Sequence, residues 1–407
     1  MEVYLVGGAV RDQLLGRPVK ERDWVVVGAV PADLEREGYR QVGADFPVFL
    51  HPDTQEEYAL ARRERKTAPG YHGFVTEFSP DVSLTDDLLR RDLTINAMAQ
   101  NAAGEVIDPY GGRRDLEARL LRHVSAAFVE DPVRVLRVAR FAARFAALGF
   151  TVATETQQLM RAMVDQGEVS ALVPERVWQE MARALGEARP EVFFGTLRDC
   201  GALQIILPEL DRLWGVPQPE RWHPEIDTGV HVMMALRLAA DASAPLPVRF
   251  AVLMHDLGKG LTPPHRWPQH AGHENSGVAS IDAVCDRLRV PNDCRDLARL
   301  ACRFHTHVHT VTELRPATVL QTLEQCDALR RPARFADLLA VCEFDARGRK
   351  GLEARDYPQA ALFARALVAA QQTNLTPEEM AGMDGALIGE RLRRLRLAAI
   401  AALGLRD

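Results

Sequence analysis

The sequence lacks the features that mark secreted, zinc-ribbon or membrane-spanning proteins. Its six cysteines all lie at or after residue 200 and form no CxxC pair, so neither a disulfide framework nor a zinc ribbon is indicated. No apolar run approaches the roughly 18 residues that a membrane span needs, and the opening segment MEVYLVGG has no basic region or cleavage site. We therefore expect a cytoplasmic protein with buried thiols and no membrane contact.

The chain also lacks internal repeats, low-complexity tracts and a strong charge of one sign. Its net charge of −6 argues against an indiscriminate polyanion binder, although eight arginines lie between positions 113 and 144 and four more in ERLRRLRLAAIAAL near the C-terminus. These two arginine clusters are either solvated helix faces or nucleic-acid contacts. A hydrophobic share of 47% and a length of 407 residues predict two to four folded units.

The pattern of apolar residues predicts an α+β protein. Up to about residue 110, short Val/Leu runs such as VYLVGG and DWVVVG alternate with polar turns, which indicates a small α/β head. From about residue 116 onward, Ala/Leu/Arg stretches with helical spacing predominate, so we expect the remainder to be mostly helical. Pro, Trp and Gly in residues 213–225 suggest a linker, and residues 351–359 are a weaker candidate.

A Glu-x-Asp pair at the start of DWVVV is the first candidate site. On a strand, Glu21 and Asp23 would project from the same face, and a cation between them would relieve their repulsion. Mg²⁺ fits, because it binds through one or two carboxylates together with substrate phosphates. Gly7 and Gly8 would let backbone N–H groups approach those phosphates, and Arg11 would add charge-assisted contacts. The alternative is a solvated strand edge.

Four segments that occur in order carry a resemblance to a known family. They are GGAVRDQLLG, ERDWVVVG, RRDLTINAMA and EDPVRVLRVARF. Together they resemble the bacterial CCA-adding tRNA nucleotidyltransferases of class II, which share their head with poly(A) polymerases. The likeness continues through IDPYGG, ERVWQEM, HPEIDTGVH and HDLGKGLTPP, so it covers nearly the whole chain and points to the multifunctional type with a C-terminal HD domain.

The resemblance implies a polymerase-β-like head followed by a helical neck, body and HD domain. Its boundaries would fall at 1–115 for the nucleotidyltransferase head, 116–222 for the neck and body, 223–350 for the HD phosphohydrolase domain and 351–407 for a helical tail. It implies template-independent addition of CCA to the 3′ end of tRNA from CTP and ATP. The body and the C-terminal arginine helix would hold the acceptor stem by shape and phosphate contacts.

The sequence departs from the family at the metal site, where the pattern is Asp-x-Asp. Glu21 is one methylene longer, and the octahedral geometry of Mg²⁺ tolerates displacement poorly. We predict that Glu21 still binds metal, with an altered preference between Mn²⁺ and Mg²⁺, and an unchanged rate in Glu21→Ala would exclude this. A third carboxylate could come from Glu57 or Glu64.

A second motif, EDPVRVLRVARF, is predicted to select the base. Asp131 and Arg134 fall at i, i+3, which would place an acceptor beside a donor on one helix face. This pair matches the Watson–Crick edges of cytosine and adenine and opposes those of uracil and guanine. Alternatively, Asp131 is only a helix N-cap. The resemblance places further groups around the incoming nucleotide: Gly8, Arg11, Arg91, Arg137 and Arg140. For Arg91, an ion pair with Asp92 at the surface is the alternative.

Nine of the twelve histidines lie between positions 223 and 309, which favours a second metal site. The segments GVHVMM and LMHDLGKG resemble the HD phosphohydrolase pattern, in which imidazoles and a shared aspartate hold a divalent metal and activate water. The ligands it implies are His231, His255, Asp256, His273, His305 and Asp345, and mixed N/O ligation suits Ni²⁺, Mn²⁺ or Co²⁺. Phosphatase and 2′,3′-cyclic phosphodiesterase activities would follow. Four other histidines are expected on the surface or in loops: His265, His270, His307 and His309.

Several alternatives compete with full CCA addition. A poly(A) polymerase shares the head motifs, but its relatives usually carry a basic tail instead of an HD domain. Enzymes that add only CC or only A differ mainly in a loop, here within residues 66–87. Alarmone synthetase/hydrolases combine similar domains in the opposite order and lack the EDxxR helix. A non-catalytic tRNA-binding protein is a further alternative, in which the head would have lost its catalytic residues. The presence of Asp23, Arg91 and EDPVR argues against it.

Overall fold

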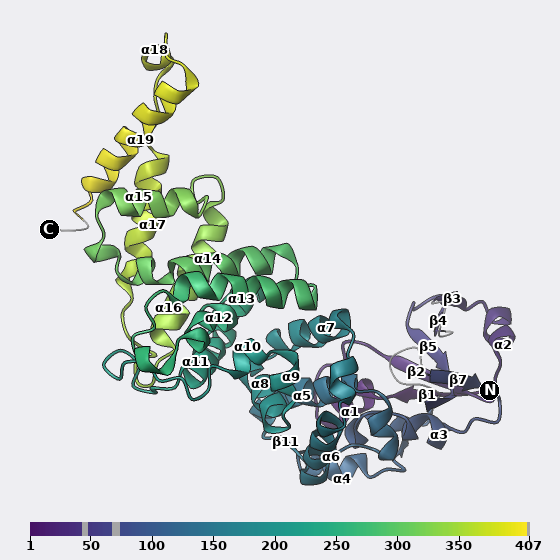
Figure 1. The fold of residues 1–407 in the computed structure, drawn as a ribbon. Helices are drawn as coiled ribbons and strands as arrows, with labels where there is room; N and C mark the ends of the chain where they lie inside the picture. Colours follow the sequence, from purple (N-terminus) through teal and green to yellow (C-terminus); the bar gives the residue numbers. More distant parts are fainter. Residues whose placement is uncertain (43–47, 67–73, 405–407) are drawn as a thin grey trace. The chain divides into compact units, whose positions relative to one another are not determined.

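The computed structural model describes residues 1–42, 48–66 and 74–404, and the chain divides into two compact units. The N-terminal unit comprises residues 1–184 and 192–206, and the C-terminal unit comprises residues 185–191 and 207–407. Figure 1 shows strands at the N-terminal end of the chain and helices through the rest. The predicted α+β class is confirmed. In the described part of the chain, the search for a helix long and apolar enough to cross a membrane finds none.

A mixed seven-stranded sheet forms the head of the N-terminal unit. The strands lie side by side in the order β3 (Arg40–Val42), β4 (Val48–Leu50), β5 (Glu57–Leu60), β2 (Asp23–Val27), β1 (Glu2–Val6), β8 (Ala99–Gln100) and β9 (Val106–Ile107). β2 and β5 run parallel, and the other neighbouring pairs are antiparallel. Two further strands, β6 (Arg62–Lys66) and β7 (Phe74–Phe78), form a separate hairpin.

The alternation of side chains along β2 builds an apolar layer on each face of the sheet. Val25 packs with Val6, Leu88 and other apolar side chains on one face. Val26 packs with Leu34 and Phe49 on the other. Because successive side chains of a strand point to opposite faces, the run WVVV is buried on both sides. Asp23 is the first residue of β2 and lies on the same face of the sheet as Val25, at the edge of the apolar layer.

Helices complete the N-terminal unit. Four short ones belong to the head: α1 (Gly8–Leu14), α2 (Pro31–Arg36), α3 (Leu84–Leu89) and α4 (Gly112–Glu117). The parallel pair β10 (Leu120–Leu121) and β11 (Thr151–Val152) accompanies the longer helices α5 (Val133–Phe145), α6 (Thr154–Asp165), α7 (Pro174–Leu185), α8 (Pro190–Asp199) and α9 (Ala202–Ile206). The 3₁₀ turns of the described part of this unit are η1 (Thr94–Asn96), η2 (Ala126–Glu130), η3 (Ala146–Leu148) and η4 (Glu168–Ala171), and Asp131 follows η2 in an extended conformation.

Helices and 3₁₀ turns build the described part of the C-terminal unit. Its α-helices are α10 (Pro208–Asp211), α11 (Thr228–Asp241), α12 (Leu246–Met254), α13 (His273–Leu288), α14 (Asn292–His309), α15 (Pro316–Gln325), α16 (Pro332–Arg347), α17 (Pro358–Gln371), α18 (Pro377–Met380) and α19 (Gly385–Ala401). Its 3₁₀ turns are η5 (Leu257–Leu261), η6 (Pro264–Arg266) and η7 (Val311–Glu313). Many of the helices begin with proline at the first turn, where its missing N–H costs nothing.

Helix α12 lies at the centre of the C-terminal unit. It contacts α11, α14 and α16, and its sequence LPVRFAVLM is buried almost all round. A helix with apolar side chains on every face is stable only when neighbours cover it on all sides. The chain leaves this helix through His255 and Asp256, so its end carries two polar residues directly into the core.

The segment read as a linker from its composition is part of the C-terminal unit. Residues 213–225 are anchored by a bridge between Pro217 and Asp227, and Gln218 and His223 are buried. The prediction of a spacer is therefore wrong, because prolines and tryptophan here support a compact turn. All six cysteines are free and buried, as predicted.

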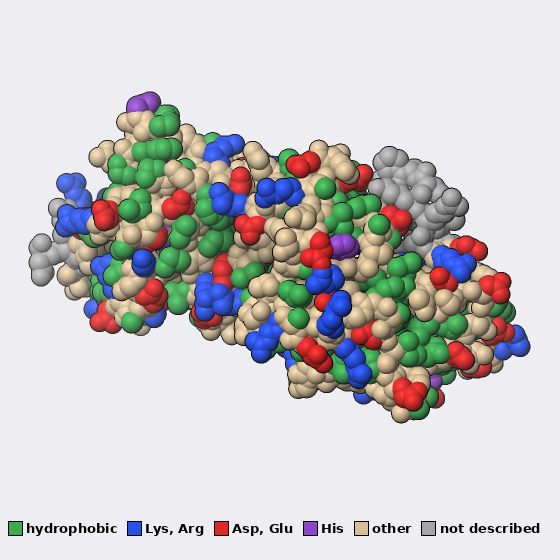
Figure 2. Space-filling view, turned by 90° about the horizontal axis from the view of Figure 1, so that it is seen from below, with side chains coloured by type: hydrophobic (Ala, Val, Ile, Leu, Met, Phe, Trp, Pro, Cys, Tyr) green, Lys and Arg blue, Asp and Glu red, His purple; other side chains and the backbone are tan. Residues whose placement is uncertain are grey.

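Charged side chains are mixed over the surface. On the face that Figure 2 presents, Lys and Arg side chains alternate with Asp and Glu side chains. The arginines of α19 follow this pattern, since Arg393 pairs with Glu324 and Arg394 with Glu390 on an exposed helix. This arrangement agrees with the modest net charge of −6.

Candidate functional site

The predicted carboxylates lie together in a polar cavity of about 510 Å³ at the start of β2. Its lining includes Glu21 and Asp23, and it also holds Glu56 and Glu57 from the neighbouring strand and turn. The structure differs from the prediction in one respect, because β2 begins at Asp23 and Glu21 lies in the preceding loop. Glu21 is therefore placed by the loop and not by the strand.

Electrostatic effects on Asp23 show which charges surround it. Partial withdrawal from water raises the pKa of Asp23, the nearby Arg91 guanidinium opposes this rise, and Glu21 adds to it. Glu57 is the residue opposite Asp23 in the parallel pairing of β2 and β5. Of the two candidates for a third carboxylate, Glu57 thus shares the cavity, whereas the side chain of Glu64 lies outside the described part of the structure.

The glycine pair adjoins this cavity because Val6 pairs with Asp23 across β1 and β2. Gly7 has φ of +68°, and a Cβ on it would lie 2.8 Å from Nη1 of Arg91. A side chain at this position would therefore be strained and would displace the guanidinium. Gly8 opens α1, where Arg11 packs against it. Four of the predicted residues, Gly8, Arg11, Arg91 and Asp23, are thus neighbours.

A buried network fixes Arg11 and links it to α5. The guanidinium of Arg11 donates to Oδ1 of Asn96 at 2.5 Å, and the amide of Asn96 donates to Asp92 at 3.1 Å. Asp92 in turn accepts from Nε of Arg137 at 2.7 Å. Burial alone would raise the pKa of Asp92, but Arg137 and Asn96 hold it well below the usual value. The alternative interpretation, a surface ion pair between Arg91 and Asp92, is therefore wrong, because Asp92 is buried against Arg137 and Arg91 pairs with Asp87.

The base-selection pair is not arranged as the sequence suggests. Asp131 lies before α5, and its carboxylate accepts from the backbone N–H of Val133 at 3.0 Å, as an N-cap does. The Arg134 guanidinium points elsewhere and donates to the carbonyls of Ala127 and Arg90 at 2.6 and 2.7 Å. Asp131 and Arg134 are close in the chain, but in this conformation both side chains form hydrogen bonds with backbone groups of the protein.

Two residues of the motif ERVWQEM complete this region, and our reading of the motif assigned them no role. Arg176 of α7 donates to both carboxylate oxygens of Asp131, at 2.9 and 3.3 Å. Glu180, one turn later, accepts from Nε of the buried Arg140 at 2.5 Å. The i, i+4 spacing of an arginine and a glutamate was the available signal, because it places both on one helix face.

The predicted ligands of the second site come together in the C-terminal unit. All of them are buried, with exposed fractions of 8% or less. They arrive from the starts and ends of helices: His231 from α11, His255 and Asp256 after α12, His273 and His305 from α13 and α14, and Asp345 from α16.

These residues form two adjoining triads, and within each triad the three ligand atoms lie within 4.8 Å of one another. The first comprises His231, His255 and Asp345, and the second comprises Asp256, His273 and His305. They meet where Nε2 of His255 lies 3.2 Å from Asp256 and 3.8 Å from Asp345. Burial alone would lower the pKa of His255, but these two carboxylates raise it to about 9. A site that attracts a proton so strongly also suits a metal cation.

Three of the four imidazoles are oriented by their other nitrogen. Nδ1 of His255 lies 2.7 Å from the carbonyl of Val252, Nδ1 of His273 lies 3.0 Å from that of His270, and Nδ1 of His305 lies 2.9 Å from that of Ala301. Such contacts fix the tautomer and leave Nε2 directed at the cluster, as in metal-binding histidines generally. Nδ1 of His231 lies 3.1 Å from the Glu225 carboxylate without forming a hydrogen bond. Nε2 of His255 and Oδ1 of Asp256 are buried without a hydrogen-bond partner, which fits atoms reserved for a metal.

Three residues of this region, His309, His223 and Glu225, were missed or misplaced by sequence reasoning. His309 is not a surface residue, because its Nε2 lies 2.7 Å from Asp345 and its Nδ1 lies 2.8 Å from the hydroxyl of Tyr357. His270 lies in a loop, as expected, although it is only 2% exposed. His223 and Glu225 adjoin His231 and form a further group of possible ligands with it. The segment HPEID contained this signal.

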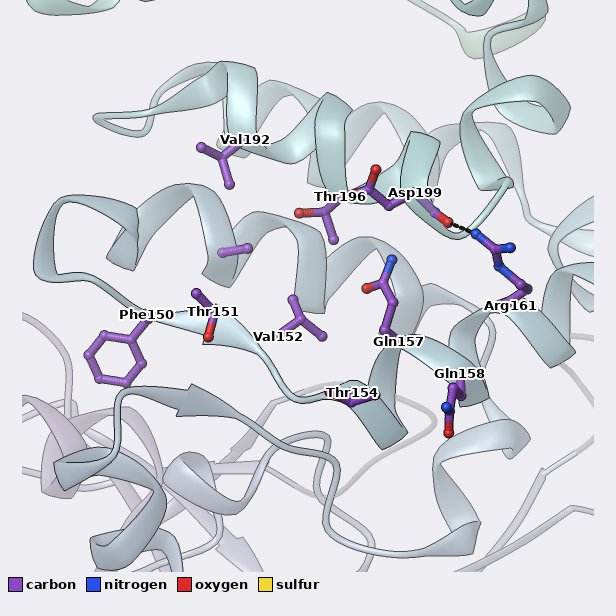
Figure 3. Close-up of a pocket in the computed structure, with 11 residues that line it drawn as sticks. Phe150, Thr151, Val152, Thr154, Gln157, Gln158, Arg161, Val192, Thr196 and Asp199 are labelled. Atoms are coloured by element: carbon purple, nitrogen blue, oxygen red, sulfur yellow. Dashed lines mark hydrogen bonds between the residues drawn. The ribbon is translucent and has the colours of Figure 1, made fainter.

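A separate cavity of about 740 Å³ lies among α5, α6, α8 and β11, away from the predicted site residues (Figure 3). Gln157 points into it, and Arg161 donates to the backbone carbonyl of Asp199 at one side. Thr151 and Thr196 add polar atoms to a wall that also carries the apolar Phe150, Val152 and Val192. The loop predicted to distinguish partial enzymes falls in part on residues 67–73, which lie outside the described residues.

Two segments of the N-terminal half match known families. Residues 3–122 match the family described as "Poly A polymerase head domain". Residues 149–213 match the one described as "Probable RNA and SrmB-binding site of polymerase A". The first match contains the carboxylate cavity and the glycine pair. Ten of the eleven residues that line the cavity of Figure 3 fall within the second.

Solved structures share the fold of the whole chain. A CCA-adding enzyme in its apo form II is 21% identical with a TM-score of 0.67, and the match covers 98% of this chain and 88% of that one. A CCA-adding enzyme in complex with ATP has a TM-score of 0.65 at 19% identity, with coverages of 98% and 86%. The Thermotoga maritima CCA-adding enzyme complexed with tRNA has a TM-score of 0.61 at 20% identity, with coverages of 99% and 91%. These likenesses confirm the polymerase-β-like head and the mostly helical body.

Curated relatives match along the full length. The "Multifunctional CCA protein" of Alkalilimnicola ehrlichii is 61% identical over 99% of this chain and 98% of its own length. That of Thioalkalivibrio sulfidiphilus is 62% identical with the same coverages. Identity at this level over both units, with the head motifs and the histidine cluster in place, leads to one conclusion: the chain belongs to the family of multifunctional CCA proteins.

Proposed function

We propose that this protein adds CCA to the 3′ end of tRNA from CTP and ATP, without a nucleic-acid template. The observation that carries the proposal is the full-length identity of about 60% to multifunctional CCA proteins, in a chain whose head holds a cavity with Glu21 and Asp23. Structures of more distant relatives contain ATP, CTP or tRNA. The protein would act in the cytoplasm on the acceptor stem and 3′ end.

In this proposal the head cavity holds Mg²⁺ through Glu21 and Asp23, with Glu57 as the third carboxylate. Bound Mg²⁺ would supply positive charge to the phosphate oxygens of the nucleotide. Gly7 and Gly8 leave room for the triphosphate beside the backbone, and Arg91 adds a cation at the same edge of the sheet.

We further propose that Asp131 and Arg134 read the Watson–Crick edge of the incoming base. To bind the base, Asp131 would release its hydrogen bond with Arg176. Arg134 would release its hydrogen bonds with backbone carbonyls. Arg137 and Arg140, held by Asp92 and Glu180, would line the same pocket as fixed cations. A carboxylate acceptor beside a guanidinium donor matches the Watson–Crick edges of cytosine and adenine and opposes those of uracil and guanine.

The test is extension of a tRNA trimmed to its discriminator base, with Mg²⁺ and all four nucleoside triphosphates, followed by sequencing of the 3′ ends. The proposal predicts ends that read CCA. Ends that stop at CC would indicate a partial enzyme, and ends that gain only A would indicate an A-adding or polyadenylating enzyme. Unextended tRNA that still binds the protein would indicate a non-catalytic binding protein.

We propose a second activity for the C-terminal unit, a metal-dependent hydrolysis of phosphate esters that includes 2′,3′-cyclic phosphodiesters. The support is the pair of buried triads with oriented imidazoles. These residues would hold Ni²⁺ or another transition metal, which would activate water when bound. Residues 223–350 would form this HD domain together with residues 207–222, which belong to the same compact unit. The neck and body, expected at 116–222, would then end at residue 206, with the head at 1–115 and the tail at 351–407.

Hydrolysis of adenosine 2′,3′-cyclic phosphate in Ni²⁺, Mn²⁺, Co²⁺ or Mg²⁺ tests this second proposal. Activity should appear with at least one transition metal and disappear in Asp256→Asn, which keeps the shape of the residue but removes its charge. Leu387→Ala, a change at an exposed position on α19, is the matched control. Absence of hydrolysis in all four metals would refute the proposal.

A further inference from the structure

A cavity of about 630 Å³ opens beside the histidine cluster of the C-terminal unit. His273 and His309 form part of its wall, and Trp222 lies elsewhere on the same wall. Its size is typical of small-molecule sites, which span roughly 300–1,000 Å³. Whatever ligand fills this cavity would therefore reach both the proposed metal ligands and a large aromatic side chain.

The part of the cavity near the metal ligands carries buried donors. Nζ of Lys259 lies 2.7 Å from Asp256 and donates to the amide oxygen of Gln218 at 2.6 Å. Gln218 is only 2% exposed, and its Nε2 has no hydrogen-bond partner. A buried amide N–H without a partner costs free energy, so the Gln218 amide would gain by donating to a ligand. A phosphate oxygen could accept this hydrogen bond and would also be attracted by the neighbouring Lys259 ammonium. This wall therefore suits an anionic group.

A second cation connects this wall to the aromatic residue. Arg349 is buried, and its Nη2 lies 3.3 Å from Asp345. Its Nη1 donates to the backbone carbonyl of Trp222 at 3.1 Å, while its Nε is unpaired. The same side chain thus contacts a proposed metal ligand and fixes the backbone that carries the indole.

Trp222 is unusual among the large aromatic residues because its side chain is 49% exposed. The guanidinium of Arg221 covers one face of the ring, with Cζ 4.8 Å from the ring centre. Because Trp222 lines the cavity, a flat ligand there would stack on the other face of the ring. Among the residues lining the cavity, the exposed carboxylate of Glu313 could accept an amino group of such a ligand.

From these contacts we infer that Trp222 is the nucleobase platform of the C-terminal site, so that this site selects nucleoside phosphates over base-free sugar phosphates. The phosphate occupies the wall formed by Lys259, Gln218 and Arg349, and the base stacks on the indole. This inference rests on the proposed phosphohydrolase function and adds the residue that sets its substrate preference.

The test compares adenosine 2′,3′-cyclic phosphate with methyl ribofuranoside 2′,3′-cyclic phosphate, which lacks the base. Trp222→Ala should raise KM for the nucleotide about tenfold, since stacking on one aromatic ring is worth that order of affinity, and leave KM for the base-free diester unchanged. Trp222→Phe should restore most of the affinity. Leu387→Ala, at a position 52% exposed on α19, should change neither.

An equal rise of KM for both substrates, or no change for the nucleotide, would overturn the inference. If the unmodified protein hydrolyses neither substrate, the proposed activity fails. The inference is then decided by calorimetric titration with adenosine 2′-phosphate and with base-free ribose phosphate. Weaker binding of the nucleotide alone in Trp222→Ala would sustain the platform, and equal binding by both proteins would reject it.

Discussion

The two proposed sites differ in how far the protein alone completes them. In the head, Glu21, Asp23 and Glu57 are exposed at the end of a strand, and part of the site is a loop. In the C-terminal unit, the ligand atoms are buried, and three of the four imidazoles already have their second nitrogen bound to a backbone carbonyl. The comparison indicates that the head site is completed by substrate phosphates and metal together, whereas the histidine cluster is preorganised.

The largest expected effect is that of Asp23→Ala on nucleotide addition. Loss of a carboxylate that we propose to hold the metal should remove several kcal/mol of transition-state stabilisation, so the rate should fall roughly a thousandfold or more. Single-turnover extension of trimmed tRNA measures it. Hydrolysis at the C-terminal site should be unchanged, and a parallel loss there would break the separation of the two sites.

Asp92→Asn should destabilise the N-terminal unit by about 2–3 kcal/mol, because Arg137 would lose its buried partner. The folded-state pKa of Asp92 is depressed, so its contribution is present above the unfolded value of about 3.9 and is lost as pH falls through the folded value. The difference in denaturation midpoint between the variant and the unmodified protein should therefore be smaller at pH 3.5 than at pH 7. An equal difference in denaturation midpoint at pH 3.5 and at pH 7 would contradict the depressed pKa of Asp92.

Glu225→Gln tests whether the histidine cluster is preorganised. Glu225 does not belong to the two triads, but it orients His231 from 3.1 Å, and loss of such a partner typically weakens metal binding 10–100-fold. Competition with a coloured chelator measures Ni²⁺ affinity. Glu353→Gln, an exposed carboxylate elsewhere in the unit, is the control. Unchanged affinity in Glu225→Gln would show that the imidazole needs no orientation.

The smallest effect concerns the methylene that separates Glu21 from the family aspartate. Glu21→Asp should change the ratio of the Mg²⁺ and Mn²⁺ rates by less than about tenfold, because both side chains offer an oxygen and Mg²⁺ is the more sensitive to position. Glu21→Ala should lower both rates much further. Rates that are indifferent to both changes would remove Glu21 from the site.

Sequence reasoning predicted the elements that have strong local patterns. The alternation in DWVVV and the spacing in VRVLRVARF gave β2 and α5, and the histidine-rich segments gave the buried cluster. Pairings between distant residues were not predictable in the same way. Arg137 with Asp92 and Arg176 with Asp131 depend on how helices pack.

The errors have a common physical cause. Residues 213–225 resemble a spacer by composition, yet their buried Gln218 and His223 line the cavity beside the histidine cluster. His309 looked like one of several histidines at a helix end, and only the fold shows that it reaches Asp345. Composition reports the average environment of a residue, whereas the partner of a polar side chain is set by tertiary structure.

The most direct test of two independent sites in one chain is sequencing of the 3′ ends that trimmed tRNA acquires with Mg²⁺ and four nucleoside triphosphates. The unmodified protein and Asp256→Asn are compared in parallel. We predict CCA ends from both proteins at similar rates, because Asp256 belongs to the buried cluster and not to the head cavity. Failure of the unmodified protein to form CCA, or loss of addition in Asp256→Asn, would contradict the account.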